Sequence, residues 1–198
     1  MPMDFVAQVY AYLQPGGIVM FPLVISSVCM WVLIIDRVLY YRQLGRDDIP
    51  LRQAVGMLAA KAAPAGATGL RAGVVTAFLA ERTGDRDLDK KILDRCAMRA
   101  RPSIRRALAL IATLAAVAPL FGLLGTVTGM ITTFDVIALF GTGNPKAMAG
   151  GISEALITTQ SGLTAAIPGL FMSTYLMRRA GRLEGRLDET VAVLKRHL

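Results

Sequence analysis

Three long stretches without a charged side chain constrain the fold of this chain more than any other feature. They cover residues 16–35, 107–134 and 155–177 and contain 20, 28 and 23 residues. A hydrocarbon core of ~30 Å is crossed by about 20 helical residues, because each residue adds ~1.5 Å. Each stretch is therefore long enough to cross a bilayer. The sequence predicts an all-α, polytopic membrane protein with three transmembrane helices.

Composition agrees with this interpretation. The chain of 198 residues is 54% hydrophobic, and its mean hydropathy is +0.51. A soluble domain of this length rarely needs so many long uncharged runs. No internal repeat or linker divides the sequence, so residues 1–198 are predicted to form a single domain built around the three spans.

The basic residues are distributed unevenly, and their positions predict the topology. Of the 22 Lys and Arg residues, 15 lie in residues 36–106 and six in residues 178–198. Lys and Arg are enriched in cytoplasmic loops. These two segments are therefore expected in the cytoplasm as long helices, with the N-terminus and the 135–153 connection on the outer side.

The cytoplasmic segment shows the pattern of a helix–turn–helix. Helices are predicted over residues 51–63 and 70–82, on either side of the turn-forming stretch Pro64–Gly69. Asp85 is predicted to cap a third helix.

Two further helical features are expected. Residues 1–14 are nearly uncharged and carry aromatic side chains, which predicts an interfacial helix on the membrane. If the third cytoplasmic helix continues into the second span, the two form one long helix with kinks near Pro102 and Pro119.

A cluster of arginines ends the cytoplasmic segment, next to the second span. We expect it to contact phospholipid head groups, because basic residues at this depth meet anionic lipids. Nucleic-acid binding is not expected at this position. The cluster comprises Arg99, Arg101, Arg105 and Arg106.

The sequence supports no metal or cofactor site. His197 is the only histidine, and Cys29 and Cys96 are the only cysteines. Without a Cys/His cluster there is no basis for a metal site. Since one cysteine lies in the first span and the other in the basic segment, both are expected to be free thiols.

Small and hydroxyl side chains recur at helical spacing on the second and third spans. Such faces let helices approach closely in lipid and let hydroxyls bond across the contact. These faces are expected to meet or to line a shared cavity; packing alone is the simpler alternative. The third-span edges are Glu154, Thr158, Ser161, Ala165 and Thr159, Gly162, Ala166, Gly169; the second-span face is Ala112, Ala115, Pro119, Gly122, Thr126, Gly129, Thr133.

Glu154 is the one acid at the start of the third uncharged stretch. An acid in a membrane helix is costly unless it faces water, a partner or a pore. A rival interpretation makes Glu154 a first-turn acid that the helix dipole favours.

Two motifs carry a resemblance to a known family. The first is APLFGLLGTVTGM at residues 118–130, and the second is GGISEALITT at residues 150–159. Gly162-Leu163 and Ala166-Ile167-Pro168 follow the second motif. Together they resemble the ExbB/TolQ/MotA proton-channel family, and its ExbB branch most.

The resemblance implies a homopentamer in the bacterial inner membrane. Its second and third spans would surround a pore that holds the helices of two ExbD-type single-span partners. Proton flow past an aspartate of the partner would drive rotation, and a TonB-type protein would deliver the work to outer-membrane transporters.

The resemblance also implies roles for particular residues. Thr126 and Thr159 match pore threonines near the partner's aspartate, and Glu154 matches an acid near the outer end of the third span. Thr158 and Thr133 are expected on the same proton pathway. The residues expected in helix packing are Gly122, Gly129, Gly162, Pro119 and Pro168.

Gln160 and Ser161 depart from the family pattern, since both are more polar than the residues of enteric ExbB. The N-terminal segment is also shorter. Other functions remain open, namely a TolQ-like envelope motor, or a scaffold that oligomerises without conducting. An intramembrane enzyme has poor support, because Ser161 is not accompanied by an intramembrane histidine or paired acid. No enzymatic activity is expected.

Overall fold

A computed structural model describes residues 16–46, 48–60 and 69–198, and every regular element among them is helical. This confirms the all-α prediction. Three helical segments, Met20–Arg46, Arg86–Phe140 and Pro145–Arg196, are long and apolar enough to cross a membrane. The predicted helix over residues 1–14 and most of the predicted turn at 64–69 lie outside the described residues.

The chain divides into two compact units, which we call the apolar unit and the charged unit. Of the described residues, the apolar unit contains 16–34 and 110–173, and the charged unit contains the remainder. The apolar unit holds only three charged side chains, those of Asp135, Lys146 and Glu154.

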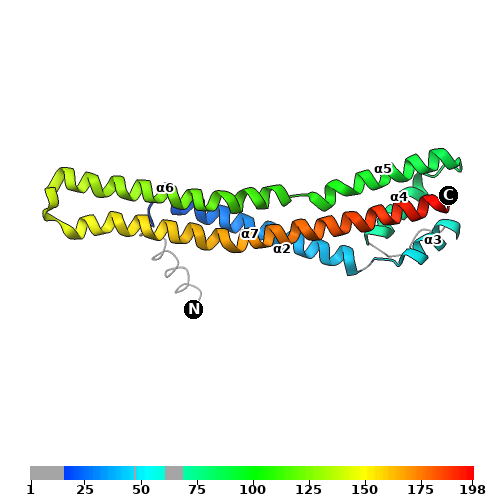
Figure 1. Cartoon of the computed structure of the whole chain (residues 1–198), viewed down its shortest axis with the longest axis horizontal. Coiled ribbons are helices and arrows are strands. Elements are labelled where there is room, and N and C mark those ends of the chain that lie inside the picture. The colour runs from blue at the N-terminus through cyan, green and yellow to red at the C-terminus, as the bar shows by residue number, and fades with distance from the viewer. Residues whose placement is uncertain (1–15, 47, 61–68) are drawn as a thin grey trace. The chain divides into compact units, whose positions relative to one another are not determined.

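In the apolar unit, α6 (Leu108–Phe140) and the part of α7 (Pro145–Arg196) up to Ser173 lie side by side and antiparallel (Figure 1). Helix α6 does not end at Asp135 but continues to Phe140. Only the short 3₁₀ turn η2 (Gly141–Gly143) and Asn144 separate the helices. The Asn144 Oδ1 atom accepts a hydrogen bond from the amide of Ala147 at 3.2 Å, as a helix cap does.

The first span is part of α2 (Met20–Arg46), which continues past the predicted boundary at residue 35. Gly17 precedes this helix with a φ of +65°, a conformation that glycine adopts without steric cost.

The charged unit contains α3 (Leu51–Ala60), α4 (Leu70–Glu81) and α5 (Arg86–Arg105), close to the three predicted cytoplasmic helices. The Asp85 carboxylate accepts hydrogen bonds from the amides of Asp87 and Leu88, so the predicted cap is present. Their core is formed by large buried side chains, among them Val75, Phe78 and Leu93.

Helices α5 and α6 are not continuous, which corrects the expectation of one long kinked helix. Helix α5 ends at Arg105, three residues after Pro102, and Ala107 has a φ of +63°. The interruption deprives the last carbonyls of α5 of their helical donors. Two side chains of α2 bond to these carbonyls: Arg37 Nη1 donates to Ser103 O at 3.1 Å, and the Tyr41 hydroxyl donates to Ile104 O at 2.6 Å. By contrast, Pro119 lies within an unbroken α6.

A buried carboxylate holds the turn between α4 and α5. Asp89 Oδ1 accepts hydrogen bonds from the amide and hydroxyl of Thr83 at 2.9 and 3.1 Å, and Oδ2 pairs with Arg82 Nε at 3.2 Å. Asp89 lies outside the uncharged stretches. Burial acts to raise the pKa of its carboxyl, but the hydrogen bonds from Thr83, Gly84 and Arg82 outweigh burial and lower the pKa below the ordinary aspartate value.

We predict that Asp89→Asn lowers the free energy of unfolding by about 2 kcal/mol, because charged hydrogen bonds to buried groups are worth ~1.5–3 kcal/mol. Asp87→Asn is the matched control, since its exposed pair with Lys90 contributes less than ~0.5 kcal/mol. Thermal unfolding of the detergent-solubilised protein measures both.

The same carboxylate predicts an acid-sensitive contribution. Because its folded pKa lies below the unfolded one, this contribution is present above an unfolded pKa of ~3.9 and is lost as the pH falls through the folded value. The difference between wild type and Asp89→Asn should therefore shrink below about pH 4. A difference that stays constant at acid pH would contradict this assignment.

Candidate functional site

Helices α6 and α7 meet along their small faces, and glycines set the closeness of the contact. A Cβ atom added to Gly129 would lie 2.6 Å from the carbonyl oxygen of Gly151 and 2.8 Å from the amide nitrogen of Ala155. One added to Gly162 would lie 2.8 Å from the carbonyl oxygen of Ala118. Real Cβ atoms do not approach backbone this closely, so side chains are excluded at these positions. Close backbone approach of this kind is typical of helix pairs in membranes.

Thr158 and Thr133 lie inside this contact. Both side chains are buried, and Thr158 occupies the space that the missing side chain of Gly125 leaves. Thr133 takes the corresponding place against Gly151. The Thr158 hydroxyl donates to the backbone oxygens of Glu154 and Ala155, each at 3.0 Å, and the Thr133 hydroxyl donates to Gly129 O at 3.0 Å. Both threonine side chains therefore fill space between α6 and α7, and their place on a proton pathway stays a prediction.

Thr126 and Thr159 lie at the edge of the contact, and both remain partly exposed. The Thr159 hydroxyl donates across to the carbonyl of Gly122 at 3.3 Å and within α7 to that of Ala155 at 3.0 Å. The Thr126 hydroxyl donates to the carbonyl of Leu123 at 2.6 Å. The two threonines thus bond to consecutive carbonyls in one turn of α6. The structure brings together residues that are 33 positions apart in the sequence.

Glu154 lies in the interior of α7, because that helix begins nine residues earlier at Pro145. It is therefore not a first-turn acid, and this rival interpretation is wrong. Its half-buried carboxylate lies against Gly17, where a Cβ atom would overlap the carboxylate oxygen. The carboxylate thus lies against a residue three positions before α2 begins, near the helix N-terminus, where the helix dipole favours a negative charge.

Pro119 and Pro168 interrupt the hydrogen bonding of α6 and α7 without breaking either helix. Proline has no amide hydrogen, so the carbonyls four residues before, those of Ala115 and Thr164, lose their helical donors. Ser161 lies on the same helix as Pro168. Its hydroxyl oxygen is buried and has no hydrogen-bond partner among the described residues.

The family model described as the MotA/TolQ/ExbB proton channel family matches residues 55–189 of the chain. The chain belongs to this family. The match includes both threonines, Glu154 and all of the glycine contact between α6 and α7.

Curated relatives agree with the family assignment. The chain is 28% identical to the "Biopolymer transport protein ExbB" of Salmonella typhimurium, over 88% of this chain and 78% of that protein. It is 33% identical to "Putative biopolymer transport protein ExbB-like 1" of Synechocystis sp., over 82% of this chain and 68% of that protein. A "Putative biopolymer transport protein ExbB homolog" of Methanothermobacter thermautotrophicus is 26% identical over 97% of this chain.

Three of the four arginines expected at lipid head groups form ion pairs with carboxylates of this chain. Arg99 pairs with Glu81 at 2.6 Å, Arg101 with Asp188 at 2.6 Å, and Arg105 with Glu184 at 2.6 and 2.7 Å. The hydrogen bonds from Arg105 lower the pKa of the Glu184 carboxyl. In the part of the chain that the structure describes, Arg106 has no such pair. Lipid contact by these four arginines stays a prediction.

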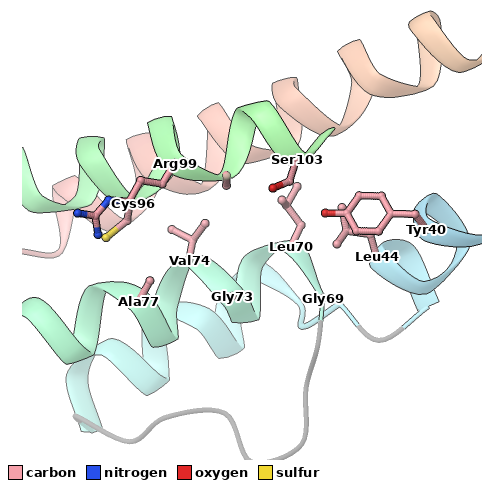
Figure 2. A pocket seen from close by; sticks show the side chains of 11 residues that line it. Tyr40, Leu44, Gly69, Leu70, Gly73, Val74, Ala77, Cys96, Arg99 and Ser103 are labelled. Carbon is pink, nitrogen blue, oxygen red and sulfur yellow. The ribbon is translucent and has the colours of Figure 1, made fainter. Parts of the chain in front are cut away.

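A cavity of about 310 Å³ in the charged unit has few polar or reactive groups at its wall (Figure 2). Gly69 and Gly73 leave space beside α4, and the polar groups at its wall include the Cys96 thiol and Arg99. Burial raises the pKa of that thiol, and Glu81 raises it further, so the reactive thiolate is disfavoured. Within the described ranges, no group of His, Cys, Asp and Glu side chains could hold a metal ion.

Sequence reasoning missed three residues of the site, Gly17, Gly125 and Gly151. A signal for Gly125 was present, since Gly122, Gly125 and Gly129 are spaced by three and four residues along one helical face. The contact between Gly17 and Glu154 had no such signal, because the two residues lie far apart in the sequence and Gly17 precedes α2.

We predict that Gly129→Ala weakens the α6–α7 contact by about 1–3 kcal/mol, the usual cost of overpacking. Its new methyl group would meet backbone atoms that cannot move aside. Gly150→Ala is the matched control, because no atom lies within 4 Å of a Cβ added to Gly150. The control should stabilise α7 by about 0.5–1 kcal/mol. Unfolding in mixed detergent micelles measures both, and equal effects of the two substitutions would contradict the close contact.

Proposed function

We propose that this chain is an ExbB-like subunit of a motor driven by the proton motive force. Several copies, five by family resemblance, would surround two ExbD-type single-span helices in the bacterial inner membrane. Through a TonB-like protein, the motor would energise transport across the outer membrane. The names of the curated relatives, which describe biopolymer transport, support the proposed role in transport.

The observation that carries the proposal is that Thr126 of α6 and Thr159 of α7 donate to consecutive carbonyls, those of Leu123 and Gly122, in one turn of α6. A threonine hydroxyl donates one hydrogen bond and accepts others. Both hydroxyls donate to main-chain carbonyls, so their lone pairs remain able to accept. A protonated carboxyl of a partner can donate to them, and an ionised one can receive a hydrogen bond after the hydroxyl rotates.

The proton carrier itself is proposed to belong to the partner. The three uncharged stretches of this chain contain no carboxylate. A charge crossing 100 mV releases ~2.3 kcal/mol, so repeated proton steps on a partner's acid can drive a mechanical change. This chain would supply the hydroxyls and the rigid wall.

The proposed topology follows the charges. Residues 36–106 and 178–198 would lie in the cytoplasm and the N-terminus in the periplasm, as the positive-inside rule favours. The charged unit, with its ion pairs between α5 and α7, would then be the cytoplasmic part of the subunit.

Two alternatives share the same architecture. A TolQ-like subunit of an envelope motor would use the same threonines with another partner. A scaffold that does not conduct is favoured by Thr158 and Thr133, whose hydroxyls are buried and bonded within their own helices. The scaffold would need the glycine contact but not the hydroxyls at its edge.

We predict that Thr126→Val and Thr159→Val each leave assembly intact but abolish energised transport in cells that carry the partner subunit. Valine keeps the shape of threonine and removes the hydroxyl. Thr132→Val is the matched control, because this exposed threonine donates to Thr128 O, away from the Gly122 and Leu123 carbonyls to which Thr159 and Thr126 bond. Uptake of a transported substrate and pull-down of the partner are measured together. Full transport in both variants would favour the scaffold.

We also predict that Glu154→Ala lowers transport more than assembly, because the carboxylate lies beside the start of α2 rather than within the glycine contact. Growth under transport-limiting conditions measures the effect, with co-purification of the partner as the assembly control. Unchanged growth would remove the proposed role of Glu154.

A further inference from the structure

The joint between α5 and α6 has a backbone conformation that its residues do not favour. Arg106 has a φ of −52° and a ψ of 136°, and Ala107 has a φ of +63°. These angles correspond to a type II turn over residues 105–108, whose third residue is usually glycine because its φ is positive. In this chain the third residue is alanine, for which the left-handed region is sterically costly. The turn is therefore strained.

The sequence of the joint favours a helix. Residues 99–110 contain no glycine and read RARPSIRRALAL. Arginine, alanine and leucine are among the strongest helix formers. Pro102 does not explain the break, because it lies inside α5, and a proline disturbs the turn of helix before it rather than the residues after it. The cause of the interruption therefore lies outside the joint itself.

Two side chains of α2 stabilise the interrupted form. Arg37 Nη1 donates to the carbonyl of Ser103 at 3.1 Å, and the Tyr41 hydroxyl donates to that of Ile104 at 2.6 Å. Arg37 is 6% exposed and Tyr41 is fully buried. Buried hydrogen bonds of this kind are costly to lose, because the group that is left behind stays unsatisfied. These two bonds offset the strain of the turn.

The same two carbonyls have other donors available within the chain. In a continuous helix each amide donates to the carbonyl four residues before it. The amide of Ala107 would then bond to Ser103, and the amide of Leu108 would bond to Ile104. The two side chains of α2 occupy these acceptors instead. The turn and the continuous helix thus satisfy the same carbonyls with different donors, so that one arrangement can replace the other.

We propose that residues 105–108 are a two-state joint, which is a type II turn while Arg37 and Tyr41 bond to it and becomes helical when they release it. Arg37 keeps a partner after release, because its Nε and Nη2 atoms donate to Asp36 at 2.9 and 2.7 Å. Helix α2 thereby controls whether α5, which carries ion pairs to α7, ends before α6 or runs into it. This inference does not depend on the proposed function.

The test uses a pair of histidines that binds Ni²⁺ when the residues between them are helical. Arg106→His with Leu110→His places two imidazoles four residues apart at exposed positions across the joint. Arg182→His with Arg186→His, on the unbroken α7, is the matched control pair. Both chains carry His197→Ala, and calorimetry of the purified protein measures Ni²⁺ binding. The joint pair should bind about tenfold more weakly than the control pair, because apparent affinity falls with the helical fraction. Equal affinities would overturn the proposal.

The role of α2 is tested in the chain that carries the joint pair. Tyr41→Phe keeps the ring and removes the donor to Ile104, which leaves that carbonyl free for the helical amide. Ni²⁺ should then bind about fivefold more tightly, the factor that corresponds to one such hydrogen bond. Tyr40→Phe is the matched control, because it removes the neighbouring hydroxyl and leaves the bond to Ile104 in place. An unchanged affinity in Tyr41→Phe would overturn the control by α2.

A further variant of the same chain tests the joint without changing α2. Glycine adopts a positive φ without steric cost and is a poor helix former, so Ala107→Gly favours the turn. Ni²⁺ binding to the joint pair should weaken several-fold. Ala192→Gly, at an exposed position on α7, is the matched control and should leave the binding unchanged. Equal or tighter binding in Ala107→Gly would overturn the two-state joint.

Discussion

The apolar unit depends on the close approach of two backbones. Lipid chains are as apolar as leucine, so no hydrophobic force holds helices together within a membrane. Van der Waals contact at short distance must replace it, and only glycine permits that distance at Gly125, Gly129 and Gly162. The same approach buries Thr158 and leaves Thr159 at the edge, within reach of a carbonyl of α6. The chemistry proposed for the edge is therefore a consequence of how the interior packs.

The charged unit is stabilised by a different principle. Its helices end or turn where their backbone groups need partners, and side chains supply them. Arg37 and Tyr41 donate hydrogen bonds to the final carbonyls of α5, and Asp89 accepts hydrogen bonds from the α4–α5 turn. Ion pairs between α5 and the last part of α7 complete the unit. In the proposed position of this unit outside the membrane, water would solvate the outer faces of these helices.

The candidate site could be predicted in part. Helical periodicity placed Thr126, Gly122 and Gly129 near one another on the second span, since residues three or four apart share a face. Periodicity could not show which threonine hydroxyls are buried and which are exposed. The four threonines have the same chemistry and differ only in what covers them. Burial separates Thr158 and Thr133 from Thr126 and Thr159. For Glu154 the sequence allowed two interpretations, and the early start of α7 excludes the first-turn one.

The sequence by itself determined the all-helical class, the three apolar segments and the family resemblance. These features are local, since a run without charge or a pair of short motifs is complete within its own residues. Only the tertiary structure decided that α5 and α6 separate at Ala107 and that Arg101 and Arg105 bond to carboxylates. Each of these depends on segments that are distant in the sequence. Periodicity defines the face on which a side chain lies, whereas the neighbour that covers this face is set by packing.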